Sequence, residues 1–182
     1  NGQATLGEVY VFHNAENWQT AHLRVYASNR LRPNATLGGS VSETITDTEV
    51  PTITYQTGQI RMPPTWNRYG DPSSGGIGED WPRTLAHEMG HYYLFLDDHY
   101  LGLDDKGQVV SIDSCTGTAM MDPYRYSEFR DQGNWLPACQ DTMATHLTGR
   151  SDWETMSLFY PELAGPDERG ANEGPALMPF DF

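Results

Sequence analysis

The stretch HEMGHYYLFLDDHY, residues 87–100, has two histidines four positions apart, with a glutamate beside the first. It lies largely within residues 79–96, which have acidic residues and a proline at their start and apolar residues at helical spacing, so we expect a helix there. Residues four apart lie one turn apart on the same helix face, so His87 and His91 can reach one metal ion. Glu88 projects to the side, where it can reach a water on that ion without binding the ion itself. The stretch therefore predicts a metal-binding helix.

A catalytic zinc site needs three protein ligands and one open position. If the helix ends near Leu96, the chain turns back within a few residues, and Asp97, Asp98 or His99 can supply the third ligand. Zinc would lower the pKa of its bound water to about 7, and Glu88 would take the proton. The alternative is an amphipathic helix whose histidines have this spacing by chance. The compact set of downstream ligands makes us favour the metal site.

The stretch resembles the zinc-binding segment of the metzincin clan of metallopeptidases. Two variants of that clan use aspartate as the third ligand. The snapalysin pattern, HExxHxxGxxD, would place it at Asp97. The pattern of IgA-peptidase-like and CLCA proteins, HExxHxxxGxxD, would place it at Asp98 and often continues with an acidic residue and a tyrosine. Because residues 98–100 read Asp-His-Tyr, the second pattern fits better. The resemblance thus implies that Asp98 joins His87 and His91, with Asp97 and then His99 as the alternatives.

Both patterns have a glycine where the helix ends, and this chain has Leu94 or Phe95 there. Another residue must therefore adopt the left-handed backbone conformation, and we expect one of the aspartates to do so. If Asp98 binds the ion, Asp97 should point away, and His99 should flank the cleft within reach of substrate.

A second motif, GTAMMDPY at residues 117–124, is similar to the metzincin Met-turn, which places a methionine beneath the zinc. Alignment with Ala-Leu-Met-x-Pro assigns that position to Met121, although Met120 and Met121 can also be ordinary core residues. Some clan members use a tyrosine two positions after this methionine to stabilise the transition state. Tyr124 follows Met121 by three positions, so its role stays open.

The two cysteines, Cys115 and Cys139, lie on either side of this motif. We expect a disulfide between them, which would stabilise the fold by roughly 3 kcal/mol and hold the turn in place. Two free thiols are the alternative.

The chain has 182 residues and a formal net charge of −14 at pH 7. So acidic a surface repels nucleic acid and anionic lipid, and no apolar run is long enough to span a membrane. The chain starts at Asn1, so we interpret it as a processed chain or a piece of a larger multidomain protein, and we expect it to be secreted, extracellular and monomeric. Calcium could bind at Asp104 and Asp105, but a solvated turn is the simpler interpretation.

The rest of the sequence predicts an α+β fold. Alternating or β-branched segments predict strands at residues 7–13, 21–28, 40–46 and 50–62. A turn-rich segment at 33–39 follows the second strand, and a hairpin at 102–112 follows the first helix. Two more helices are predicted at 138–149 and 152–160. The resemblance implies a metzincin-like mixed, twisted sheet over the active-site helix and an irregular lower part with the Met-turn and a C-terminal helix. We expect a catalytic domain at residues 1–164 and a Gly/Pro-rich tail or linker at 165–182.

The function implied by the resemblance is a zinc-dependent endopeptidase acting on proteins or peptides, with Glu88 as the general base. An edge strand above the cleft would pair with the extended substrate, and TGQIRMPP at residues 57–64 is the candidate. The main alternative is a non-catalytic binding or adhesion module with structural zinc. Glu88 argues against it, because a structural site needs no base. A zinc hydrolase of non-peptide amides is a third possibility.

Overall fold

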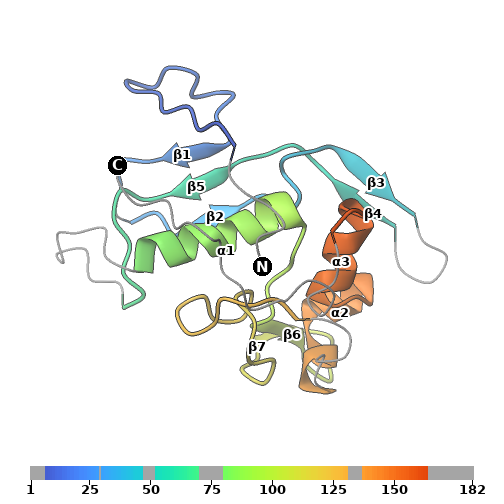
Figure 1. Ribbon diagram of the computed structural model, residues 1–182. Coiled ribbons are helices and arrows are strands. Elements are labelled where there is room, and N and C mark those ends of the chain that lie inside the picture. Colours follow the sequence, from blue (N-terminus) through green and yellow to red (C-terminus); the bar gives the residue numbers. More distant parts are fainter. Residues whose placement is uncertain (1–6, 29, 47–51, 70–79, 131–136, 164–182) are drawn as a thin grey trace.

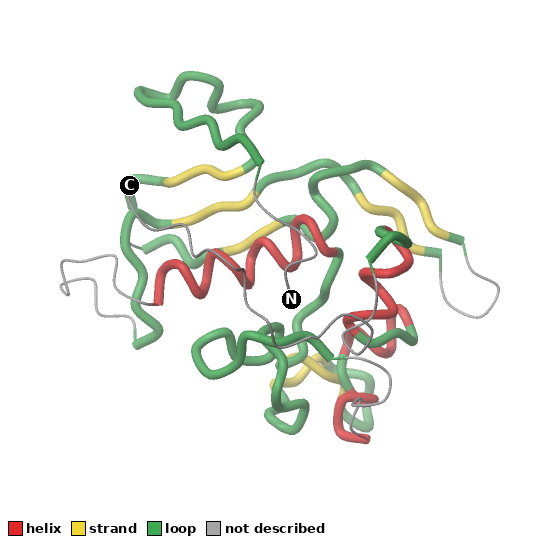
Figure 2. Tube along the Cα trace, viewed as in Figure 1, coloured by secondary structure: helices red, strands yellow, loops and turns green. Residues whose placement is uncertain are grey.

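The computed structural model describes residues 7–28, 30–46, 52–69, 80–130 and 137–163. A three-stranded sheet lies above helix α1 (Asp80–Leu94), and a hairpin and the later helices lie on the other side of α1 (Figure 1). Figure 2 shows that the part below α1 consists largely of loops. The prediction of a mixed α+β fold is confirmed at this level.

The three strands of the sheet are β1 (Leu23–Val25), β2 (Asn34–Ala35) and β5 (Ile60–Met62), in the order β1-β5-β2. The central strand β5 is parallel to β1 and antiparallel to β2, so the sheet is mixed, as expected. The prediction that residues 57–64 form an edge strand is therefore wrong, because these residues contain the central strand β5. The edge next to α1 is β2, in the segment predicted as a turn. Two residues are too short a strand to show an alternating pattern.

Helix α1 packs its apolar stripe against the sheet, as its sequence spacing predicts. The buried side chains Ile60, Met62 and Tyr92 form the centre of this cluster, and the partly buried ones around them are Leu23, Ala35, Trp81, Leu85, Met89 and Tyr93. The proline expected in the first helical turn, Pro82, lies there. The packing of α1 thereby orients its opposite face toward the lower part of the molecule.

Two strand predictions change in the structure. Residues 7–13 form no strand, and their large apolar side chains are exposed. The segment 50–62 is split between two sheets instead of forming one strand or a hairpin: β4 (Ile53–Tyr55) pairs with β3 (Glu43–Ile45), whereas β5 belongs to the main sheet. Alternation marks a segment that can be a strand, but a pairing partner elsewhere in the chain decides whether it becomes one.

The lower part begins with the expected hairpin, β6 (Leu101–Leu103) and β7 (Val109–Ser111), which pair antiparallel. A 3-10 helix (Pro137–Asp141) and the short helix α2 (Met143–Thr148) replace the single helix predicted at 138–149, and Gly149 ends α2 in the left-handed conformation. Helix α3 (Asp152–Phe159) confirms the last predicted helix. The tail at 165–182 lies outside the described residues.

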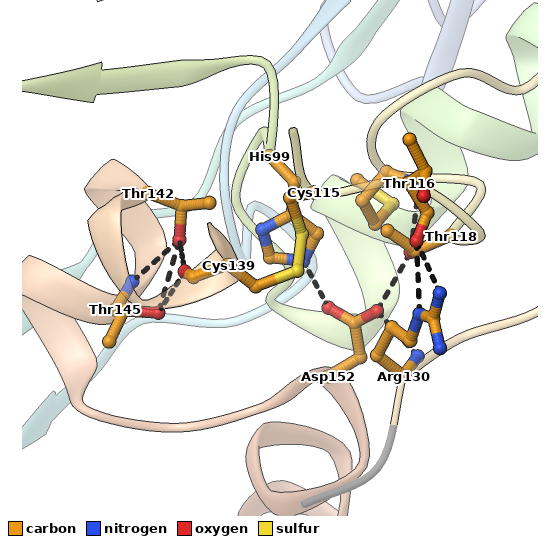
Figure 3. The surroundings of a disulfide bond; sticks show 10 residues. His99, Cys115, Thr116, Thr118, Arg130, Cys139, Thr142, Thr145 and Asp152 are labelled. Atoms are coloured by element: carbon orange, nitrogen blue, oxygen red, sulfur yellow. Dashed lines mark hydrogen bonds and ion pairs between the residues drawn. A yellow bond between two sulfur atoms is a disulfide. The ribbon is translucent and has the colours of Figure 1, made fainter. Parts of the chain in front are cut away.

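A disulfide joins Cys115 to Cys139, as predicted, and it connects the loop before the Met-turn motif to the 3-10 helix (Figure 3). Among the described residues, no helix is long and apolar enough to cross a membrane.

Candidate metal centre

Helix α1 carries three polar side chains into a largely buried region. His87, Glu88 and His91 are each no more than 9% exposed, although all three are polar or ionisable. The two imidazole Nε2 atoms lie 3.1 Å apart, which is the result of their one-turn spacing. Burying such groups is unfavourable unless they are paired or bind an ion, so their position requires an explanation.

The helix ends at Leu94 because Phe95 adopts a left-handed conformation, with φ of 62°. This conformation costs a residue other than glycine roughly 1–2 kcal/mol. Aromatic packing offsets that cost: the Phe95 ring stacks on Phe159 with centroids 3.4 Å apart and meets Tyr55 edge to face at 5.0 Å. On another side of the ring lies Gly38, where an added Cβ would come within 2.5 Å of it. The expectation that an aspartate makes this turn is therefore wrong.

The turn at Phe95 brings Asp98 to the two histidines. Its Oδ1 atom lies 3.1 Å from Nε2 of His87 and 3.2 Å from Nε2 of His91. One potential ligand atom from each of these three residues lies within 4.8 Å of the others. The left-handed residue occupies the glycine position of the pattern HExxHxxxGxxD, which explains why the second aspartate reaches the histidines.

The other two candidates for the third ligand lie elsewhere. Asp97 lines a small neighbouring cavity of about 210 Å³ and is not part of the converging group. His99 is 1% exposed and pairs with Asp152, its Nε2 atom 2.5 Å from a carboxylate oxygen. The expectation that His99 flanks the cleft and meets substrate is therefore wrong.

The hydrogen bonds of the histidines fit a metal site. Nδ1 of His87 lies 2.9 Å from the carbonyl oxygen of Ala119, and Nδ1 of His91 lies 2.5 Å from that of Leu96. A carbonyl only accepts, so each Nδ1 must carry the proton. In the neutral form of either ring, the Nε2 lone pair would therefore face the other ring and the Asp98 carboxylate. Such an arrangement favours a positive charge between these atoms, either a proton on an imidazole or a metal ion, and a backbone bond to the distal nitrogen is typical of metal-binding histidines.

The charges at the site are strongly coupled. Burial opposes ionisation of His91, but its hydrogen bond to Asp98 and the charge of that carboxylate raise the pKa of the imidazole to about 9. Burial likewise disfavours the charged form of Asp98, but the hydrogen bonds from both histidines hold its pKa well below the usual range. The site is thus a pocket of negative potential that favours a cation, whether a proton or a metal ion.

Glu88 lies beside this group rather than within it. Glu88 lines both the small cavity and a larger one of about 380 Å³. Burial raises the pKa of Glu88, and the nearby imidazoles of His91 and His87 reduce this effect. A carboxylate with a raised pKa, next to both a ligand cluster and a cavity, is well suited to accept and return a proton.

Tyr100 is the site residue that sequence reasoning did not assign a role. Its ring stacks with that of His87, at 6.4 Å between centroids, and it lines both cavities. Burial raises its pKa, as do the charge of Asp98 and a hydrogen bond to that carboxylate. The hydroxyl therefore stays protonated at neutral pH and can donate. The only sequence signal was the tyrosine of the family pattern, two residues after the aspartate.

The two methionines of residues 117–124, the predicted Met-turn, lie in different surroundings. The methionine packed against α1 is Met120, fully buried, whose sulfur would lie 2.8 Å from a Cβ placed at Gly90. Met121 lines the larger cavity instead. Tyr124 also lines it, but its hydroxyl accepts a hydrogen bond from Trp66 Nε1 at 2.8 Å and lies 3.0 Å from the Thr84 hydroxyl.

Comparisons of the chain with protein-family models, with curated proteins and with solved structures find no match.

Proposed function

We propose that this protein is a zinc-dependent endopeptidase. The observation that carries the proposal is the position of Glu88, a buried carboxylate that lines a cavity of about 380 Å³ next to the His87, His91 and Asp98 cluster. A purely structural metal site has no need for a base at this place. Two imidazoles and one carboxylate are a ligand set of the kind found in catalytic zinc sites with an open position.

The three side chains His87, His91 and Asp98 would hold the ion, which when bound supplies a Lewis acid and an acidified water. Glu88 would take a proton from the attacking water and later deliver it to the leaving amine. The Tyr100 hydroxyl, protonated and on the cavity wall, would donate a hydrogen bond to the oxygen on which negative charge develops.

The surroundings of the site are consistent with a peptide substrate. The two residues of the edge strand β2, Asn34 and Ala35, line the small cavity together with Asp98. We therefore propose that β2, rather than residues 57–64, would pair with an extended substrate chain. The larger cavity is lined in part by apolar side chains, which include Trp66, Met121 and Pro123. It would accept a large apolar side chain of the substrate.

The Cys115–Cys139 disulfide supports a secreted, extracellular protein, because disulfides persist in oxidising compartments. We propose that the substrate is an extracellular protein or peptide.

The test is cleavage of a denatured, alkylated protein by the zinc-loaded chain, followed by mass spectrometry of the products. The unmutated chain should cleave the denatured substrate, a chelator should stop this cleavage, and added zinc should restore it. Glu88→Ala should retain zinc and lose at least about 10²-fold in activity, as expected for a missing general base. Glu128→Ala, which removes an exposed carboxylate, is the matched control and should cleave like the parent.

Full activity in Glu88→Ala, or activity that a chelator does not affect, would rule out this mechanism. A chain that binds zinc but cleaves neither the denatured protein nor a peptide library would instead be a binding module.

A further inference from the structure

One face of helix α3 packs along residues 95–99, the loop that carries Asp98. Asp152, Met156 and Phe159 are spaced by four and three residues, so they lie on the same side of the helix. Phe159 stacks on Phe95 at the start of the loop, and Asp152 pairs with His99 at its end. The loop thus runs antiparallel to α3.

Between these two ends, Leu96 lies in a buried cluster with Met156 and Met120. The tyrosine after the helix adds a further contact, because the Tyr160 hydroxyl donates to the Tyr93 carbonyl in the last turn of α1 at 2.6 Å. Residues 95, 96 and 99 are therefore held by α3, whereas Asp98 faces the histidines.

The polar contact at the end of the loop is the most specific one. Asp152 is 2% exposed, and its second carboxylate oxygen accepts from the Thr118 hydroxyl at 2.9 Å and from the Arg130 backbone N–H at 2.8 Å (Figure 3). Because both oxygens are engaged, rotation of the carboxylate would break these hydrogen bonds. The backbone N–H of His99 also donates to the Met120 carbonyl at 3.1 Å, so residue 99 is fixed through both its side chain and its backbone.

We propose that Asp152 is a positioning residue of the metal centre, which acts through His99 to hold the Asp98 carboxylate toward the two histidines. This inference rests on the proposed metal site. Asp97 and Asp98 are adjacent carboxylates, and a loop free at residue 99 could present either one or neither. Fixing residue 99 selects Asp98 before the ion arrives, which reduces the ordering needed on binding. Loss of a hydrogen bond made directly to a metal ligand typically weakens metal binding about 10–100-fold. Because Asp152 acts one residue away from the ligand, we expect an effect near the lower end of that range.

The test compares Asp152→Asn, His99→Gln and the double variant. Asparagine keeps the size of Asp152 and can still accept from Thr118 and Arg130, so the fold should survive. The matched control is Ser151→Ala, which removes the N-cap of the same helix, where Ser151 Oγ accepts from Glu154 N–H at 3.4 Å, and leaves the His99 contact in place. Zinc affinity is measured by competition with a chromophoric chelator. The visible spectrum of the cobalt-loaded protein reports ligand geometry, and circular dichroism verifies folding at the same temperature.

We expect Asp152→Asn and His99→Gln each to weaken zinc binding by at least about 10-fold and to change the cobalt spectrum. The double variant should lose little more than either single one, because both act through one contact. Ser151→Ala should lower the melting temperature without changing affinity or spectrum.

Parent-like affinity and spectrum in Asp152→Asn would overturn the proposal, and so would equal losses in Ser151→Ala, since these would reflect helix stability alone. His99→Gln decides the question by itself if Asp152→Asn does not fold. Failure of the parent to bind zinc or cobalt would refute the metal centre itself, a different result from metal binding that is indifferent to Asp152.

Discussion

Replacing Phe95 tests whether aromatic packing holds the strained end of α1. In Phe95→Gly, removal of the left-handed strain stabilises the folded state by roughly 1–2 kcal/mol. The greater freedom of glycine in the unfolded chain lowers the free energy of unfolding by roughly 1 kcal/mol. Truncation of a ring that is 2% exposed and stacked on Phe159 costs about 3–5 kcal/mol. The net expectation is a loss of about 3 kcal/mol in the free energy of unfolding, measured by urea denaturation of metal-free protein.

The control is Phe95→Ala, which removes the same ring but keeps a Cβ at φ of 62°. At ordinary positions alanine is the more stabilising of the two residues, by about 0.4–1 kcal/mol. Here the order should be reversed, with the alanine variant about 0.5 kcal/mol less stable than the glycine variant, because the strain of about 1.5 kcal/mol exceeds the unfolded-state effect of about 1 kcal/mol. An alanine variant that is the more stable of the two would show that the backbone is not left-handed at this position. A glycine variant as stable as the parent would show that the aromatic contacts contribute nothing.

The remaining predictions concern the site and its support. Asp98→Ala should lose most bound zinc while Asp97→Ala keeps it, measured by metal analysis of dialysed protein; the reverse result would make Asp97 the ligand. Tyr100→Phe should keep its zinc and lower kcat by about 10²-fold with little change in KM, as expected for one lost transition-state donor; an unchanged kcat would exclude that role. Joint replacement of Cys115 and Cys139 by serine should lower the free energy of unfolding by about 3 kcal/mol in urea denaturation, because the disulfide joins residues 24 positions apart in the sequence. A change below about 1 kcal/mol would contradict this expectation.

Local geometry explains what could be predicted from the sequence. The pairing of His87 with His91 depends only on the pitch of a helix, and the apolar stripe of α1 depends on the same periodicity. The hairpin around Gly107 and the helix that starts after Ser151 follow from turn and capping residues next to them in the chain. Each of these features involves residues a few positions apart, so the sequence order alone contains the relevant distances.

The tertiary structure decided which aspartate joins the histidines. The choice depends on Phe95 adopting a conformation that its own residue type disfavours, and it does so because Phe159, 64 positions away, stacks on its ring. Burial of His99 depends in the same way on Asp152. The pairing of β2 at the sheet edge likewise depends on a partner strand 25 residues later. These features come from contacts between distant segments, whose energies exceed local preferences but leave no periodic trace in the sequence.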